Sequence, residues 1–299
     1  MKVVVSGSSG LIGTALCDAL RTQGHEPVRL VRREALSADE ISWDPATRSL
    51  DATALRGADA VINLAGEGIG EKRWTPAQKQ RLRSSRTQST ETIVTAMLAL
   101  DAPPTVLING SAIGFYGERG EEVLTESEPP GDDFLARLVT DWERSAQPAS
   151  DAGIRTVFAR TGIVLSTRGG ALARQLGFFR AGLGGTSGTG TQYLAWISLA
   201  DEVAALIWLL EHEISGPVNL TAPTPVTNRQ FVKTLGGVLH RPTTIIPMVG
   251  PRLLFGRELA DSLLLTSIRA TPGVLESHSY PFANPDLAES LQAIIETKS

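Results

Sequence analysis

Three regularly spaced glycines near the N-terminus constrain this chain more than any other feature. They follow the apolar residues 3–5 and lead directly into a helical pattern. Gly7 permits a sharp turn, Gly10 lets a pyrophosphate approach the backbone, and Gly13 lets the helix lie close to the sheet. N–H groups at the helix start would then face an anion. Because the motif stands between a strand and a helix, it predicts a dinucleotide-binding turn.

The composition points to a small-molecule partner. The chain has 299 residues, 42% of them hydrophobic, which suits a large α/β domain with a smaller one appended. Its net charge is −4 with both signs interspersed, so no basic face indicates nucleic acid and no basic amphipathic helix indicates a membrane surface. The four histidines lack metal-ligand spacing, and we predict no metal site.

The single cysteine and the chain start bear on the cellular compartment. Cys17 lies on the apolar side of the first helix, where a buried core residue is expected, and it has no second cysteine to pair with. The first residues already form a strand, which leaves no room for a signal peptide, and no apolar run reaches membrane-spanning length. We therefore expect a cytoplasmic protein.

The residues after the second predicted strand, 27–31, bear on the choice of cofactor. An acidic residue at this strand end would bind the ribose 2′-hydroxyl of NAD. Arg32 and Arg33 stand there instead, and guanidinium groups suit a 2′-phosphate. The alternative is a pair of solvated arginines in a loop. With the glycine turn upstream, the sequence favours NADP(H) as the cofactor.

Later segments add further candidate contacts. Small residues end the strand that begins at Ala60, and Arg86 on the predicted helix 76–100 could return to the phosphates, although most charges on such a helix are solvated. Arg160 ends a strand on the ligand side, where it contacts the ligand or forms a buried ion pair. The predicted cofactor-binding residues are Gly7, Ser9, Gly10, Leu11, Ile12, Arg32, Arg33, Leu64, Ala65, Gly66, Arg86, Ser111 and Arg160.

The strand–helix alternation weakens after Gly162. Gly169 and Gly170, with further glycines over residues 182–190, could be mistaken for a second phosphate site. No strand–turn–helix pattern frames them, so we interpret this stretch as an ordered loop or lid on the substrate side.

The alternation predicts an α/β fold in two parts. Residues 1–164 and about 195–215 are assigned to a Rossmann domain, a doubly wound parallel sheet that binds NADP(H). Residues about 165–194 and 216–299 are assigned to a smaller α+β domain for the substrate.

Motifs over nearly the whole chain carry a resemblance to a known family. They are residues 6–13, 63–67, 85–86, 111–117, 141–143, 184–185, 196–197 and 225–228. With them the chain resembles an atypical extended short-chain dehydrogenase/reductase of the NAD-dependent epimerase/dehydratase superfamily, and more narrowly the SDR39U1-like epimerase group. The resemblance implies a Rossmann domain with the group's own C-terminal domain. Related extended enzymes often form homodimers through the helices that match 76–100 and 133–152.

The chain departs from the wider superfamily at the catalytic pair. Typical members use Tyr-x-x-x-Lys, in which the lysine lowers the tyrosine pKa for proton exchange with the substrate. None of the three tyrosines has a lysine four positions later, and Leu135 and Val139 stand where the pair is expected. Counting back from Tyr116 places Ala112 at the serine position, and a shift of one residue restores Ser111.

Acid–base work would therefore fall to other residues. The candidates are Tyr116, Ser111 and Glu67, which directly follows the cofactor-facing turn. We expect an NADP(H)-dependent oxidoreductase or epimerase-like enzyme acting on an unidentified small molecule. One alternative is a cofactor-binding or sensing protein that has lost the chemistry, and another is a structural subunit that binds no cofactor.

Overall fold

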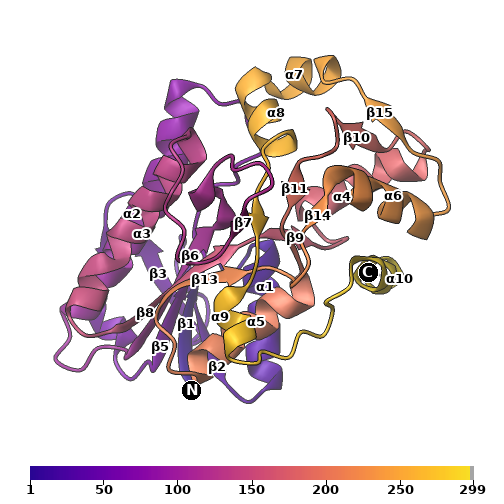
Figure 1. Ribbon diagram of the computed structural model, residues 1–299. Coiled ribbons are helices and arrows are strands. Elements are labelled where there is room, and N and C mark those ends of the chain that lie inside the picture. The colour runs from indigo at the N-terminus through magenta and orange to yellow at the C-terminus, as the bar shows by residue number, and fades with distance from the viewer. Residues whose placement is uncertain (297–299) are drawn as a thin grey trace.

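A computed structural model describes residues 1–296, and its centre is an eight-stranded sheet (Figure 1). In spatial order the strands are β13 (Gly216–Leu220), β8 (Arg155–Thr161), β6 (Val106–Ala112), β5 (Ala60–Asn63), β1 (Lys2–Ser6), β2 (Glu26–Val31), β3 (Glu40–Asp44) and β4 (Ser49–Leu50). All neighbours pair in parallel except β3 and β4. The predicted doubly wound α/β fold is confirmed.

Helices cover both faces of the sheet (Figure 1). One face carries α1 (Leu11–Thr22) and α5 (Leu199–Glu211), and the other carries α2 (Pro76–Leu98) and α3 (Phe134–Asp151). Side chains of β1 alternate between the two cores, since Val3 packs towards the first pair of helices and Val4 towards the second. A parallel strand buried on both faces reads as a continuous apolar run, as β1 does.

Polar side chains lie at the carboxyl ends of β1 and β5 and at the same level in the longer strand β6. Ser6, Asn63 and Asn109 are fully buried at neighbouring register positions of β1, β5 and β6. The Ser6 hydroxyl donates a hydrogen bond to Asn63 Oδ1 (2.6 Å), and Asn63 Nδ2 donates to Asn109 Oδ1 (2.8 Å). These bonds satisfy buried polar groups and fix the sheet edge beside which the candidate site lies.

Most of the remaining elements gather beyond the carboxyl edge and around the end of the sheet (Figure 1), whereas η1 (Ala52–Leu55) leads into the start of β5. Besides η1 they are η2 (Ile113–Tyr116), β7 (Val123–Leu124), β9 (Ile163–Leu165), α4 (Gly170–Arg180), β10 (Gly185–Ser187), β11 (Tyr193–Leu194), β12 (Trp196–Ser198), β14 (Val226–Thr227), α6 (Asn228–Val238), β15 (Thr244–Ile246), α7 (Val249–Phe255), α8 (Arg257–Leu264), β16 (Arg269–Ala270), α9 (Gly273–Ser277) and α10 (Leu287–Glu296). A separate apolar core joins α4, α6 and α10. Within residues 1–296, no helix has both the length and the apolarity to cross a membrane.

The structure corrects the sequence-based division at one strand. Residues 216–220 were expected in the smaller part, yet they form β13 and pair with β8 along its length. Leu275 of α9 and the nearby Tyr280 also pack into the core beneath the sheet. The reason is topological, because α5 returns the chain to the sheet edge and the next strand continues the parallel order.

Candidate functional site

The glycine turn between β1 and α1 is shaped by close backbone contacts. Gly7 has φ +65°, and a Cβ atom there would lie 2.6 Å from the Leu64 carbonyl oxygen. At Gly13 a Cβ would lie 2.2 Å from the Gly7 carbonyl oxygen. Gly10 is different: its φ is −79°, it is exposed, and a Cβ would come only to 3.2 Å of Gly7. Gly7 and Gly13 thus serve the fold, whereas Gly10 is exposed and a Cβ there would make one tight contact, with the Gly7 carbonyl oxygen.

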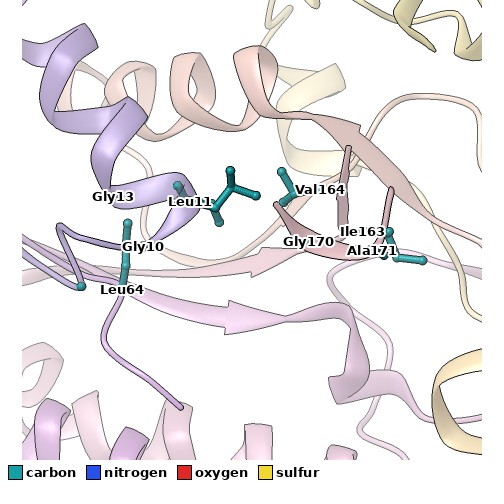
Figure 2. A pocket seen from close by; sticks show the side chains of 10 residues that line it. Gly10, Leu11, Gly13, Leu64, Ile163, Val164, Gly170 and Ala171 are labelled. Atoms are coloured by element: carbon teal, nitrogen blue, oxygen red, sulfur yellow. The ribbon is translucent and has the colours of Figure 1, made fainter. Parts of the chain in front are cut away.

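A pocket of about 330 Å³ lies beside this turn, as Figure 2 shows. No side chain caps Gly10, the residue before α1, so N–H groups of the first helical turn remain available to an anion. The opposite wall comes from β9 and the start of α4. The lining residues are Gly7, Gly10, Leu11, Ile12, Gly13, Leu64, Ile163, Val164, Gly170 and Ala171. This glycine-lined cradle fits a dinucleotide pyrophosphate.

Gly170, from the second glycine pair, lines the same pocket. The sequence predicted no strand–turn–helix around Gly169 and Gly170, but β9 precedes them and α4 begins at Gly170. A Cβ at either glycine would lie 3.5 Å from the Leu11 side chain, which extends from α1 across the pocket in Figure 2. The expectation of an unframed loop is wrong for this pair, because β9 is too short to stand out in the sequence.

The two arginines after β2 have different surroundings. Arg33 donates two hydrogen bonds to Glu40, of 2.8 and 2.7 Å, and so forms a bidentate ion pair. Arg32 is exposed and forms no hydrogen bond or ion pair with any residue in the described range. Its charge contributes, after stronger hydrogen bonds from Thr47 and Ala46, to a lowered pKa of Asp44. Arg32 therefore lies near the carboxyl end of β3 with its guanidinium available.

Arg86 of α2 is a buried cation next to the turn after β5. Its Nη1 donates to the Leu82 carbonyl oxygen (3.0 Å), and its guanidinium lies 5.2 Å from the centre of the Trp142 ring. No carboxylate within residues 1–296 forms an ion pair with it, and burial lowers the pKa of Arg86 to about 10. A Cβ at Gly66 would lie 3.1 Å from Arg86 Cζ, so the cation adjoins this turn.

Five polar residues form one buried network around the ends of β6 and β8. Arg160 donates to both carboxylate oxygens of Glu143, at 2.8 and 3.0 Å, and the Ser111 hydroxyl donates to the same carboxylate (2.6 Å). Arg160 also donates to the Tyr116 hydroxyl (3.1 Å), which in turn donates to Asn219 (2.7 Å). The ion pair is the alternative that the sequence left open for Arg160.

Tyr116 is closed off inside this network. Its ring is fully buried, and its hydroxyl has partners on two sides. Burial raises the pKa of Tyr116, and the nearby Arg160 only partly opposes that effect. The side chain therefore has the environment of a structural residue, with its proton engaged by Asn219.

Glu67 lies in the loop between β5 and α2. Its carboxylate accepts hydrogen bonds from Gln78 (2.9 Å) and Lys72 (3.2 Å), and its side chain is 22% exposed. The bond from Gln78, assisted by Lys72, lowers the pKa of Glu67. It is accordingly ionised near neutral pH and could accept a proton.

The sequence analysis missed the residues that hold these candidates in place. Glu40, Glu143 and Asn219 accept hydrogen bonds from the predicted residues Arg33, Ser111 and Tyr116, and neither Glu40 nor Asn219 belongs to a motif with a recognisable spacing. Glu143 was part of the stretch 141–143 quoted for the resemblance, which is the only signal for it. Among the described residues, no group of three or more His, Cys, Asp or Glu side chains could hold a metal ion.

Comparison with known families identifies the chain. The model of the NAD dependent epimerase/dehydratase family matches residues 3–221. The chain belongs to this epimerase family. A second model, described as a domain of unknown function (DUF1731), matches residues 246–294, which agrees with the expected group-specific C-terminal region.

Relatives in the epimerase family extend over the full chain. An epimerase family protein of Mycobacterium bovis is 45% identical and covers 97% of this chain and 96% of its own length. Epimerase family protein SDR39U1 of Homo sapiens is 35% identical over 99% of this chain and all of its own length. The crystal structure of human SDR39U1 with NADPH is similar with a TM-score of 0.92, at 33% identity and full coverage of both chains.

Proposed function

We propose that this epimerase family member binds NADP(H) in the glycine-lined pocket and acts as an oxidoreductase or epimerase-like enzyme on a small molecule. The observation that carries the proposal is the uncapped start of α1 beside Gly10, with Arg32 available at the same edge of the sheet. The NADPH in the structure of human SDR39U1 supports the choice of cofactor. Bound nicotinamide would supply hydride transfer.

Each cofactor group has a matching set of residues. The α1 backbone, with Gly10 open, would hold the pyrophosphate, and Arg32 would pair with the 2′-phosphate. Arg86 would provide its unpaired charge to an anionic group near the turn at Gly66, because a buried cation gains most from an opposite charge.

Among the acid–base candidates, the surroundings favour Glu67. Its side chain is partly exposed and ionised, whereas Tyr116 is fully buried and Ser111 is 4% exposed and bonded to Glu143. In the oxidation direction Glu67 would accept the proton of a substrate hydroxyl, and the carbon that bears this hydroxyl would give up its hydride to the oxidised nicotinamide.

A protein that binds NADP(H) without turnover is the second candidate. It is favoured by the engaged hydroxyl of Tyr116 and by the buried Val139 where the superfamily has lysine. Purified protein is titrated with NADPH by calorimetry and then incubated with sugars, nucleotide-sugars, aldehydes and quinones. Substrate-dependent loss of nicotinamide absorbance indicates the enzyme. Tight binding without such loss indicates the binding protein, and absence of NADPH binding contradicts both.

Two substitutions in the glycine turn, Gly10→Val and Gly13→Ala, should have different effects on NADPH binding and on stability. We expect Gly10→Val to weaken NADPH binding about tenfold or more with only a small fall in the melting temperature. The φ of Gly10 suits an L-residue, its Cβ would make a single tight contact of 3.2 Å with the Gly7 carbonyl oxygen, and the new side chain enters the pyrophosphate path. Gly13→Ala should lower the melting temperature instead, because its Cβ meets backbone. Calorimetric titration and thermal unfolding measure the two effects. Unchanged affinity in folded Gly10→Val would exclude a dinucleotide from this turn.

Tyr116→Phe should affect stability rather than chemistry. Removal of the hydroxyl leaves Asn219 Oδ1 without a partner and Arg160 Nη1 with only the Glu126 carbonyl oxygen (3.4 Å), which costs about 1–3 kcal/mol of unfolding free energy. We expect NADPH affinity to stay unchanged, and turnover to fall far less than the ~10²–10⁴-fold of a general acid. Urea unfolding and calorimetry measure these quantities. Loss of all turnover with NADPH binding intact would make Tyr116 the proton donor.

A further inference from the structure

A buried carboxylate lies beneath the two arginines that follow β2. The Glu40 side chain is only 2% exposed and accepts two hydrogen bonds from Arg33 and one from the Leu36 N–H (2.8 Å). Arg29 lies 2.9 Å from the same carboxylate. The hydrogen bonds from Arg33, followed by the one from Leu36, lower the pKa of Glu40 to about 2. Glu40 is therefore an anion at every working pH.

The position of Glu40 decides where Arg33 can reach. In the register of the sheet Glu40 stands opposite Arg29, two residues before Val31 ends β2. With a rise of about 3.3 Å per residue, the backbone position of Glu40 lies roughly 7 Å from the carboxyl edge of the sheet, towards the amino end of β2. Arg33 follows the strand end in sequence, so its bidentate bond to Glu40 directs the guanidinium back along the sheet and away from that edge.

Arg32 is left in a different state from its neighbours. Arg29 and Arg33 both pair with Glu40, whereas Arg32 has no ion-pair partner among residues 1–296. The charge of Arg32 contributes to the lowered pKa of Asp44, the last residue of β3, so the two side chains are near each other. Arg32 therefore lies at the carboxyl edge, where ligands of open α/β sheets bind.

We propose that Glu40 is a positioning residue that limits selectivity for NADPH over NADH by holding Arg33 away from the 2′-phosphate. This inference rests on the proposed binding of NADP(H). Glu40 withdraws one of the two cations that follow β2, and Arg32 alone reads the phosphate. The tandem arginines thus act as one phosphate ligand and one internal ion-pair partner.

The test is a double-mutant cycle on the ratio of NADPH to NADH affinity. We expect Glu40→Gln to raise this ratio about three- to fivefold, the gain from one partly exposed ion pair, because Arg33 is released to the edge. Arg33→Ala should leave the ratio within about twofold of wild type. In the double variant Glu40→Gln/Arg33→Ala the gain should disappear, because the released cation is absent.

Calorimetry with both nucleotides gives the ratios, and thermal unfolding shows that each variant is folded. A folded Glu40→Gln with an unchanged ratio, or a gain that persists in the double variant, overturns the proposal. If Glu40→Gln does not fold, Arg33→Ala decides: a ratio near wild type supports the proposal, and a tenfold fall overturns it. A wild-type protein that binds neither nucleotide rejects the proposed function itself, which distinguishes that failure from a failure of the role of Glu40.

Discussion

Arg32→Ala is expected to weaken NADPH binding by about ten- to a hundredfold and to leave NADH binding nearly unchanged. A hydrogen bond to a charged group is worth roughly 1.5–3 kcal/mol, and each 1.4 kcal/mol is a factor of ten in affinity. Arg32 is exposed and, within the described chain, pairs with no carboxylate, so its full charge is available to the 2′-phosphate. NADH lacks that phosphate and loses nothing.

The comparison separates a specific effect from general damage. Calorimetric titration of both nucleotides into wild type, Arg32→Ala and Arg33→Ala gives six dissociation constants. Arg33→Ala is the matched control, since it removes the same side chain one residue away but from an ion pair with Glu40. Equal losses for NADPH and NADH, or a wild type that prefers NADH, would contradict the assignment of Arg32.

Helices with a regular apolar period could be predicted closely. Apolar residues at helical spacing predict helices over residues 11–22 and 199–211, and α1 and α5 have these bounds. In α5 the Ser198 side chain accepts a hydrogen bond from the Asp201 N–H and fixes the start. The long helix expected at 76–100 ends at Leu98, because helix ends depend on local contacts that no residue type signals strongly.

Short strands were the main limit on the fold prediction. β3 and β9 were not anticipated, and β13 was assigned to the wrong part. A strand of three to five residues carries too little periodicity to reveal which sheet it joins. Its place is decided by pairing with distant residues, as where Gly216 meets Val157 of β8.

In the candidate site, too, roles set by local contacts could be predicted from the sequence, whereas roles set by distant contacts could not. The structural roles of Gly7 and Gly13 follow from the turn itself, and they agree with the structure, in which a Cβ at these positions would lie 2.6 and 2.2 Å from a backbone oxygen. The Tyr116 environment could not be predicted, because its hydroxyl partner Asn219 lies 103 positions away along the chain. The sequence indicates which residue types lie near the cofactor. Whether their side chains are free to bind it depends on hydrogen-bond and ion-pair partners from distant parts of the chain.

The stability of the protein is expected to fall with rising pH because of Glu202. This α5 residue is fully buried; its Oε1 accepts a hydrogen bond from the Thr161 hydroxyl (2.7 Å), and its Oε2 has no partner in the described structure. Burial raises the pKa of Glu202 from 4.5 to about 8. Between these values the folded protein keeps a proton that the unfolded chain has released, and unfolding is favoured by about 1.4 kcal/mol per pH unit.

The stabilisation is complete below pH 4.5, declines as pH rises towards 8, and is absent above that value. Urea unfolding between pH 5 and 8 should show this slope in wild type and a slope reduced by one proton in Glu202→Gln. Glutamine preserves the acceptor for Thr161 and replaces the unpartnered oxygen with an uncharged group. The exposed Glu289 of α10 provides the control, because Glu289→Gln makes the same chemical change where no buried charge is involved and should keep the wild-type slope. Parallel slopes for wild type and Glu202→Gln would mean that Glu202 is ionised in the folded protein, and that its buried carboxylate has a cationic or water partner that offsets the burial.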